Sequence, residues 1–252
     1  MVIILASSWN ASKKDRKGAW YPVKIPDTNS FVSNLKKYIP KYDSAVFVAN
    51  DPNACEQTES YANCVFQALQ MTDLIFKKTA ILDNRNKRKA KKIIENADLV
   101  ILAGGRVHCQ LKFFEEIGLK ELVKNHRGLV LAGSASAMNL CSRTFNFPEE
   151  KDEVDDREGE QFFMKGLGFH NEVLIPHFDA EEEKYTRAEN LEFDVTKEVI
   201  LPLSYGREFI AFGDDSYILL SNDQKYYFGK FYRIADEKIT ERKPLISKPS
   251  RK

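Results

Sequence analysis

The sequence has little net charge and no long hydrophobic run, and both absences exclude classes of partner. Its 252 residues carry 38 basic and 37 acidic side chains, a formal net charge of +1, so no overall field draws the chain to nucleic acid or to an anionic membrane. No apolar run could span a bilayer. The first apolar segment, residues 2–6, is too short for a signal peptide and lacks a basic flank. We expect a cytoplasmic protein that binds neither nucleic acid nor membrane.

Cysteine is also scarce, and cofactor motifs are missing. The four cysteines are scattered without metal-ligand spacing, which is typical of free thiols in a reducing compartment. No His/Cys/Asp/Glu cluster, Walker motif or dinucleotide fingerprint occurs. The densest basic run, residues 85–92, has no interleaved aromatic residues and is typical of a solvated helix face. The sequence therefore predicts no metal and no cofactor.

What the first half does contain is an alternation of strand and helix patterns. Hydrophobic residues make up 43% of the chain, enough for a sizeable core. Apolar strand patterns cover residues 2–6, 45–49, 78–82, 99–103 and 129–131, and helical patterns cover residues 30–38, 55–72, 87–96 and 110–124. Buried strands separated by helices predict an α/β fold, a doubly wound, mostly parallel sheet flanked by helices. Sites on such sheets lie at the carboxyl ends of the strands.

The second half changes character. We expect an acidic solvated loop over residues 151–160, a strand over 172–176 and a short helix over 188–191. Short alternating strands over residues 208–234, joined at residues 213–215 and 222–223, predict a β-hairpin or meander. No linker is visible, so residues 1–240 are expected to form a single domain, with residues 241–252 as a basic, flexible tail.

The stretch 128–138 predicts the most informative local structure. An apolar run ends in small residues, and Met138 then begins a helical pattern. A strand that turns sharply into a helix through small residues is the setting of a nucleophile elbow. Ser134 stands at the turn, above free N–H groups of the helix. The alternative is a tight packing turn in which Ser134 is only a helix N-cap.

Three motifs in order extend this argument: Ala103-Gly104-Gly105, Ser134-Ala135-Ser136-Ala137-Met138 and Pro176-His177-Phe178. Together they resemble the peptidase E (aspartyl dipeptidase) and cyanophycinase family of serine peptidases. The resemblance extends over residues 99–232. It implies the fold of class I glutamine amidotransferases, with serine in place of cysteine at the elbow.

The resemblance implies roles for a catalytic triad. Ser134 matches the nucleophile and His177 the general base, since a serine hydroxyl needs an imidazole to remove its proton. The position of the orienting carboxylate falls on Glu149, with Glu150 beside it. Asp214 is a second candidate, because members of the family place an acidic residue at the matching hairpin turn.

The resemblance also implies substrate-binding positions. Gly105, next to Gly104, and Ala135 match the residues whose N–H groups form the oxyanion hole, although a Gly-Gly pair also suits an ordinary turn. Arg187 follows His177 by ten residues, at the spacing of an arginine that recognises the substrate aspartate in peptidase E. Arginine suits a carboxylate because its guanidinium binds in a bidentate fork. The alternative is a surface arginine.

Several positions depart from the family pattern. Ser136 and Ala132 stand where the elbow has glycine, Arg106 where asparagine follows the glycine pair, and Ile175 where asparagine precedes Pro-His-Phe. An added side chain at the elbow is expected to strain the turn and weaken turnover. We expect a serine hydrolase that cleaves a small peptide or isopeptide through an acyl-enzyme. The alternative is a degenerate relative that binds a small ligand or a protein partner in the same pocket. The oligomeric state is left open, with a homodimer as one option.

Overall fold

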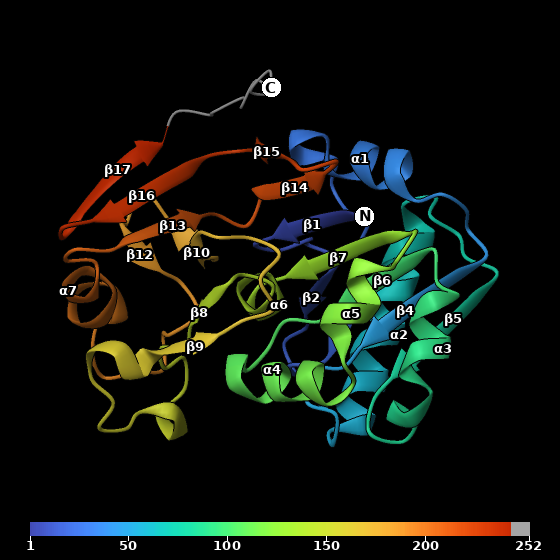
Figure 1. The fold of residues 1–252 in the computed structure, drawn as a ribbon, viewed down its shortest axis with the longest axis horizontal. Helices are drawn as coiled ribbons and strands as arrows, with labels where there is room; N and C mark the ends of the chain where they lie inside the picture. Colours follow the sequence, from blue (N-terminus) through green and yellow to red (C-terminus); the bar gives the residue numbers. More distant parts are fainter. Residues whose placement is uncertain (243–252) are drawn as a thin grey trace.

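Seven strands form the central sheet of the computed structural model, which describes residues 1–242 (Figure 1). Their order is β15-β14-β1-β7-β6-β4-β5. The bounds are β1 Val2–Ala6, β4 Ser44–Val48, β5 Lys78–Leu82, β6 Leu99–Leu102, β7 Leu129–Gly133, β14 Tyr217–Ser221 and β15 Gln224–Phe228. The first five strands in the chain run parallel, and β14 and β15 add an antiparallel edge. The predicted α/β fold with a mostly parallel sheet is confirmed.

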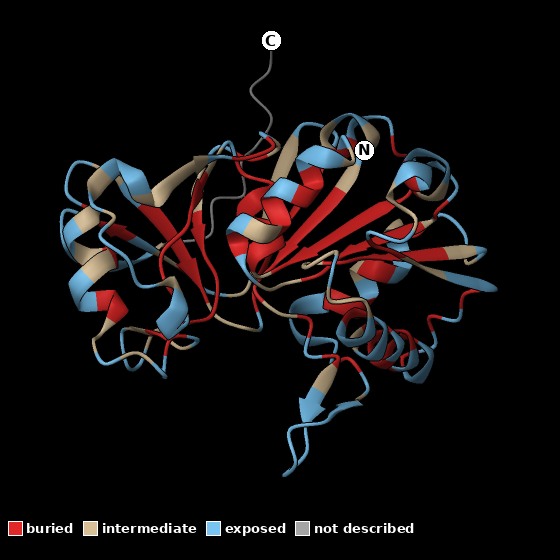
Figure 2. Ribbon diagram, turned by 90° about the horizontal axis from the view of Figure 1, so that it is seen from below, coloured by how far each residue is buried: buried red, intermediate tan, exposed pale blue. Residues whose placement is uncertain are grey.

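Helices cover both faces of this sheet because its strands are apolar on both sides. Ile3 and Leu5 pack into one core with side chains of α3 (Ala90–Glu95), α4 (Val107–Glu116), α5 (Leu119–Lys124) and α6 (Ala135–Asn139). Ile4 and Ala6 pack into a second core with α1 (Phe31–Tyr38) and α2 (Cys55–Met71). Figure 2 shows the strands as a buried layer between partly exposed helices. Among the described residues, no helix has the length and apolar character needed to cross a bilayer.

A second sheet lies beside the first and has its own core. Its order is β10-β13-β16-β17, with β10 Val173–Ile175, β13 Glu208–Phe212, β16 Phe231–Ala235 and β17 Lys238–Arg242. A short π-helical segment, Thr196–Ile200, leads into α7 (Leu201–Leu203) and packs on this core. Three small two-stranded ribbons complete the chain: β2 (Ser12–Lys14) with β3 (Trp20–Pro22), β8 (Arg143–Phe145) with β9 (Phe163–Lys165), and β11 (Phe178–Asp179) with β12 (Lys184–Tyr185).

A partly buried polar cluster joins the two sheets. Glu172, before β10, accepts a hydrogen bond from Arg242 Nη1 of β17 at 2.6 Å and another from the Tyr227 hydroxyl of β15. His170 Nε2 lies 2.9 Å from the same carboxyl group. Burial alone would raise the pKa of Glu172, but these partners outweigh it and lower the pKa to about 2. The cluster therefore contains an ionised carboxylate at neutral pH.

Four sequence predictions need correction or completion. The helix predicted over 110–124 is two helices, because the chain turns at Gly118 with φ 64°. Residues 188–191 form turns, not a helix. The acidic segment 151–160 contains short 3-10 turns at its two ends, Lys151–Glu153 and Gly159–Phe162. Glu241 and Arg242 belong to β17 and not to a tail, and the remainder of the predicted tail, residues 243–252, lies outside the described residues.

The predicted C-terminal meander is divided between the two sheets. β14 and β15 form a hairpin on the main sheet, while β13 and β16 pair with each other in the second sheet. The chain crosses from one sheet to the other through residues 213–216, between β13 and β14. This crossing carries Asp214.

Candidate active site

Ser134 occupies a strained turn between β7 and α6. Its backbone angles are φ 56° and ψ −126°, a combination that side-chain-bearing residues rarely adopt. Its N–H donates to the carbonyl of Ala6 at 3.0 Å, which fixes the turn against β1. A Cβ at Gly133 would meet the Trp9 ring at 2.5 Å, and one at Gly104 would meet the Ser134 Cβ at 3.0 Å. The small residues are needed because the backbone is this crowded.

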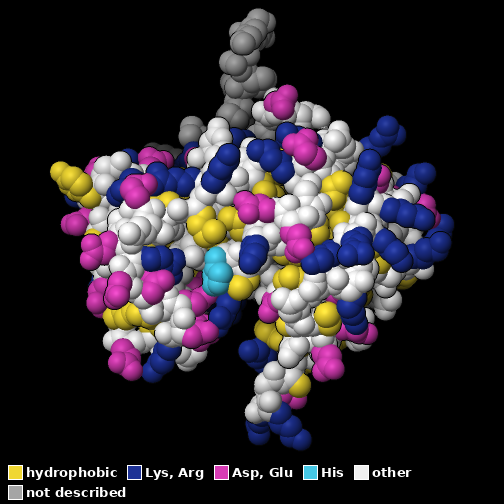
Figure 3. Space-filling model, turned by 60° about the horizontal axis from the view of Figure 1, so that its bottom comes forward, with side chains coloured by type: hydrophobic (Ala, Val, Ile, Leu, Met, Phe, Trp, Pro, Cys, Tyr) yellow, Lys and Arg dark blue, Asp and Glu magenta, His cyan; other side chains and the backbone are white. Residues whose placement is uncertain are grey.

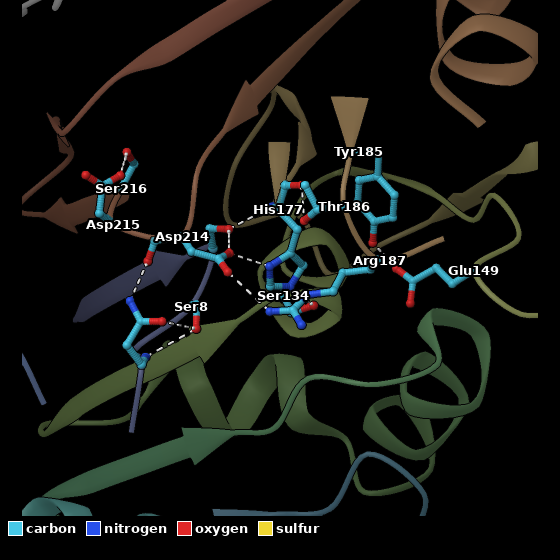
Figure 4. A network of polar contacts seen from close by, with 12 residues as sticks. Ser8, Ser134, Glu149, His177, Tyr185, Thr186, Arg187, Asp214, Asp215 and Ser216 are labelled. Carbon is cyan, nitrogen blue, oxygen red and sulfur yellow. Dashed lines mark hydrogen bonds and ion pairs between the residues drawn. The ribbon is translucent and has the colours of Figure 1, made fainter. Parts of the chain in front are cut away.

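The Ser134 side chain begins a chain of polar contacts (Figure 4). Its Oγ lies 2.8 Å from Nε2 of His177, and Nδ1 of His177 contacts the carboxylate of Asp214. His177 lies between β10 and β11 and has a positive φ of 56°. The nucleophile candidate therefore comes from the main sheet, while the imidazole follows a strand of the second sheet. The order hydroxyl, imidazole, carboxylate is that of a serine-protease triad.

Two further side chains, those of Ser7 and Arg187, hold the Asp214 carboxylate. Ser7 Oγ donates to Asp214 Oδ1 at 2.9 Å and accepts from the His177 N–H at 2.7 Å. Arg187 Nη2 lies 3.2 Å from Asp214 Oδ2. Burial would raise the pKa of Asp214, but contacts with His177, Ser7 and Arg187 lower it to about 2. The carboxyl group is thus a carboxylate at neutral pH, able to orient the imidazole and stabilise its protonated form.

Glu149, the first candidate for that carboxylate, lies elsewhere in the cleft. Its carboxyl group is hydrogen-bonded by the Tyr185 hydroxyl, and burial raises its pKa to about 7. The preference for Glu149 is corrected in favour of Asp214. The physical reason is local: the Glu153 carboxylate accepts the N–H groups of Glu149 and Glu150, at 3.0 and 3.2 Å, and this loop directs Glu149 to Tyr185. Glu150 is exposed at the cleft rim and takes no part in the triad contacts.

A cleft of about 570 Å³ opens over the Ser134 side chain. Gly104, Gly105, His177 and Arg187 line it together with Glu149. This volume lies within the range of small-molecule sites, roughly 300–1,000 Å³. The glycine pair and the elbow therefore face one cleft, as the positions of both after neighbouring strands predict.

Two backbone amides near Ser134 have no hydrogen-bond acceptor within residues 1–242. They are the N–H groups of Gly105 and of Ala135, the first residue of α6. Gly105 has φ 138°, and a Cβ there would overlap the Asn50 side chain, so only glycine suits the position. Free N–H donors beside a nucleophile are what an oxyanion hole requires.

Ser136 fits within the elbow without displacing it. The side chain is completely buried, and its Oγ accepts the Gly133 N–H at 2.8 Å. The same hydroxyl lies 2.8 Å from the Leu102 carbonyl and 2.9 Å from the Gly133 carbonyl, so it can donate to either. The expected strain from this serine is therefore not observed: its hydroxyl binds the ends of β6 and β7 together.

The two arginines flagged by the sequence differ in their partners. Arg106 Nη2 is 2.7 Å from Asp152 at the cleft rim and so is paired. Arg187 lines the cleft with about half of its side chain exposed, and one Nη atom contacts Asp214. Its predicted role in substrate recognition stays a prediction.

Sequence reasoning missed Ser7 and Trp9. Ser7 is the first residue after β1, at the carboxyl edge where sites on parallel sheets lie, and that position was the available signal. Trp9 follows on the same loop and packs on Gly133, the residue before Ser134. Within residues 1–242, no group of three or more His, Cys, Asp or Glu side chains could hold a metal ion.

Comparisons with known proteins show the family and the fold of the chain. The model of peptidase family S51 matches residues 24–219, most of the chain. Among solved structures, a candidate peptidase E protein from Listeria monocytogenes EGD-e superposes with a TM-score of 0.55 and 12% sequence identity, over 90% of this chain and 96% of that chain. At that identity the likeness shows a shared fold. The comparison with curated proteins gave no significant match.

Proposed function

The chain belongs to peptidase family S51, and from this premise we propose that it is a serine hydrolase that cleaves a small peptide or isopeptide through an acyl-enzyme. The observation that carries the proposal is the continuous contact from Ser134 Oγ through the His177 ring to the Asp214 carboxylate. Family membership supports a hydrolase of peptidase type, and these residues supply the chemistry.

In the proposed reaction, His177 Nε2 removes the Ser134 proton as Oγ attacks the scissile carbonyl carbon. Asp214 holds the ring through Nδ1 and stabilises the imidazolium that forms. The same Nε2 then donates its proton to the leaving amine, and the C–N bond breaks to give the acyl-enzyme. A water molecule, deprotonated by His177, attacks the ester, and the acid product leaves with Ser134 Oγ protonated again.

The developing oxyanion would be stabilised by the N–H groups of Gly105 and Ala135. Both lack another acceptor within residues 1–242, and both follow a strand at the Ser134 end of the cleft. One such donor contributes on the order of 10²–10³ in rate. We assign Arg187 to an acidic group of the substrate, because its partly exposed guanidinium reaches the cleft beside His177.

Labelling with a fluorophosphonate tests the nucleophile directly. The wild-type chain is expected to be labelled, and Ser134→Ala is expected to lose both the label and the release of free amine from a panel of Asp-X and other dipeptides. Ser8→Ala is the matched control, since Ser8 lines the same cleft but its hydroxyl contacts Asn10 instead of His177. Equal amine release by wild type and Ser134→Ala would reject the hydrolase and leave the alternative of a ligand-binding relative.

A further inference from the structure

One wall of the cleft is aromatic, and the proposed chemistry does not use it. Four aromatic residues line it: Trp9, Trp20, Phe47 and Tyr61. The rings of Trp20 and Tyr61 have centroids 5.2 Å apart and are tilted by 58°, and Tyr61 contacts Phe47 edge-on at 5.9 Å. Trp9 also packs on Gly133, the residue before Ser134. The aromatic wall is therefore continuous with the nucleophile.

Trp20 reaches the wall from an otherwise exposed hairpin. β2 and β3 form a two-stranded arm that stands out from the body (Figure 2), and β3 packs against α2, which carries Tyr61. Basic side chains gather at the end of this arm (Figure 3): Arg16 and Lys17 lie in its turn, and Lys13 and Lys14 lie on β2. Trp20 is the first residue of β3, directly after the turn of the arm, where it pairs with Lys14 of β2.

The exposure of Trp20 separates a binding role from a packing role. Its relative exposure is 43%, whereas Trp9 and Phe47, which pack in the core, are exposed by 6% and 1%. The next residue on the arm, Tyr21, is also exposed by 43% but does not line the cleft. A large ring left half in water and facing a cavity gains free energy when an apolar group covers it.

We propose that the wall formed by Trp20 and Tyr61 is a subsite for an aromatic side chain of the substrate, in the residue next to the bond that Ser134 attacks. This inference rests on the proposed hydrolase function. An uncharged ring is favoured over a cationic side chain for two reasons. Lys14 Nζ already lies 4.8 Å from the centroid of the Trp20 ring, and the arm's other basic groups repel a second cation.

Binding can be measured apart from catalysis. In the Ser134→Ala background, calorimetric titration with Asp-Phe, Phe-Asp, Asp-Gly and Asp-Arg is expected to give the tightest binding for a dipeptide with phenylalanine. Adding Trp20→Ala is expected to weaken binding of that dipeptide about tenfold, the size of an aromatic pair, and to leave Asp-Gly unchanged. Tyr21→Ala, with equal exposure on the same arm, is the matched control and is expected to change neither. Circular dichroism verifies that each variant is folded.

The outcomes separate the subsite from the hydrolase. Equal losses for Asp-Gly and the phenylalanine dipeptide on Trp20→Ala, or no loss for either, would overturn the subsite whether or not peptides are cleaved. Preferential binding of Asp-Arg that depends on Trp20 would overturn the uncharged occupant. If the chain with Ser134 intact cleaves no dipeptide while the Trp20-dependent preference persists, the hydrolase fails and the subsite stands.

Discussion

Replacing Ser136 decides whether its hydroxyl stabilises the elbow or strains it. In Ser136→Ala the buried Gly133 N–H loses its acceptor, since it donates to Ser136 Oγ at 2.8 Å. A buried donor left without a partner costs about 1–3 kcal/mol. Ser136→Gly incurs the same loss and a further penalty of about 1 kcal/mol, because glycine is a poorer helix residue than alanine and Ser136 lies in the first turn of α6.

These free energies translate into measurable temperatures. For a chain of this length, 1 kcal/mol corresponds to about 2–4 °C in Tm. A loss of about 2 kcal/mol therefore lowers the Tm of Ser136→Ala by about 4–8 °C, with Ser136→Gly lower still. Amine release is not expected to rise in either variant, since the hydroxyl holds the residue before the nucleophile.

Differential scanning calorimetry of wild type, Ser136→Ala and Ser136→Gly, with dipeptide turnover on the same preparations, makes the comparison. The alanine variant removes the hydroxyl alone, and the glycine variant also removes the Cβ. A Tm that rises in Ser136→Gly together with faster turnover would show that the serine strains the elbow, and would refute the stabilising role derived from its hydrogen bonds.

Three other substitutions have expected outcomes. Asp214→Asn should lower kcat by about 10⁴-fold, the size of the loss when other Ser-His-Asp triads undergo this change. Glu149→Gln should lower kcat far less. A reversed order of the two variants in kinetic assays would restore Glu149 as the orienting carboxylate. The folded chain raises the pKa of Glu149 from 4.5 to about 7, so the folded state of the wild type loses stability as pH rises through that interval. The Tm of Glu149→Gln relative to wild type should therefore increase between pH 4.5 and 8. A constant difference in Tm would contradict the burial argument. Glu172 has a pKa lowered to about 2, so its stabilising contribution is present above pH 4.5 and disappears as pH falls through about 2. Urea unfolding of Glu172→Gln should show a free energy of unfolding lower than that of the wild type by about 1–3 kcal/mol at pH 7, a difference that vanishes near pH 2. An equal difference at both pH values would argue against an ionised carboxylate.

The sequence predicts the parallel part of the fold well because burial on both faces leaves a plain signal. Residues 2–6 and 78–82 match β1 and β5 in full, and the small residues after β7 predict the elbow at Ser134. The choice of the sheet that a short strand joins leaves no such signal in the sequence. The short strands after residue 208 have the same alternating pattern whether they join the main sheet or the second one, so the meander could not be divided from sequence.

The carboxylate of the site illustrates the same limit. Glu149 and Asp214 are both acidic residues in loops, and a pattern of residue types cannot show which loop reaches His177. The contact is set by the crossing between β13 and β14 and by the Ser7 hydroxyl, which are more than 200 residues apart in the chain. Only tertiary structure brings Ser7 and Asp214 together.

The division of the proposed triad between two sheets also sets when its three residues can come together during synthesis. Ser134 is synthesised and can enter the main sheet before His177 exists, and Asp214 appears later still, on the crossing that leads back to β14. Because chains fold from the amino end as they emerge, Ser134 has no imidazole partner until residue 177 has been synthesised. A chain that stops before this crossing lacks Asp214, the proposed orienting carboxylate. For the proposed hydrolase, the topology thus makes the complete triad depend on completed folding of both sheets.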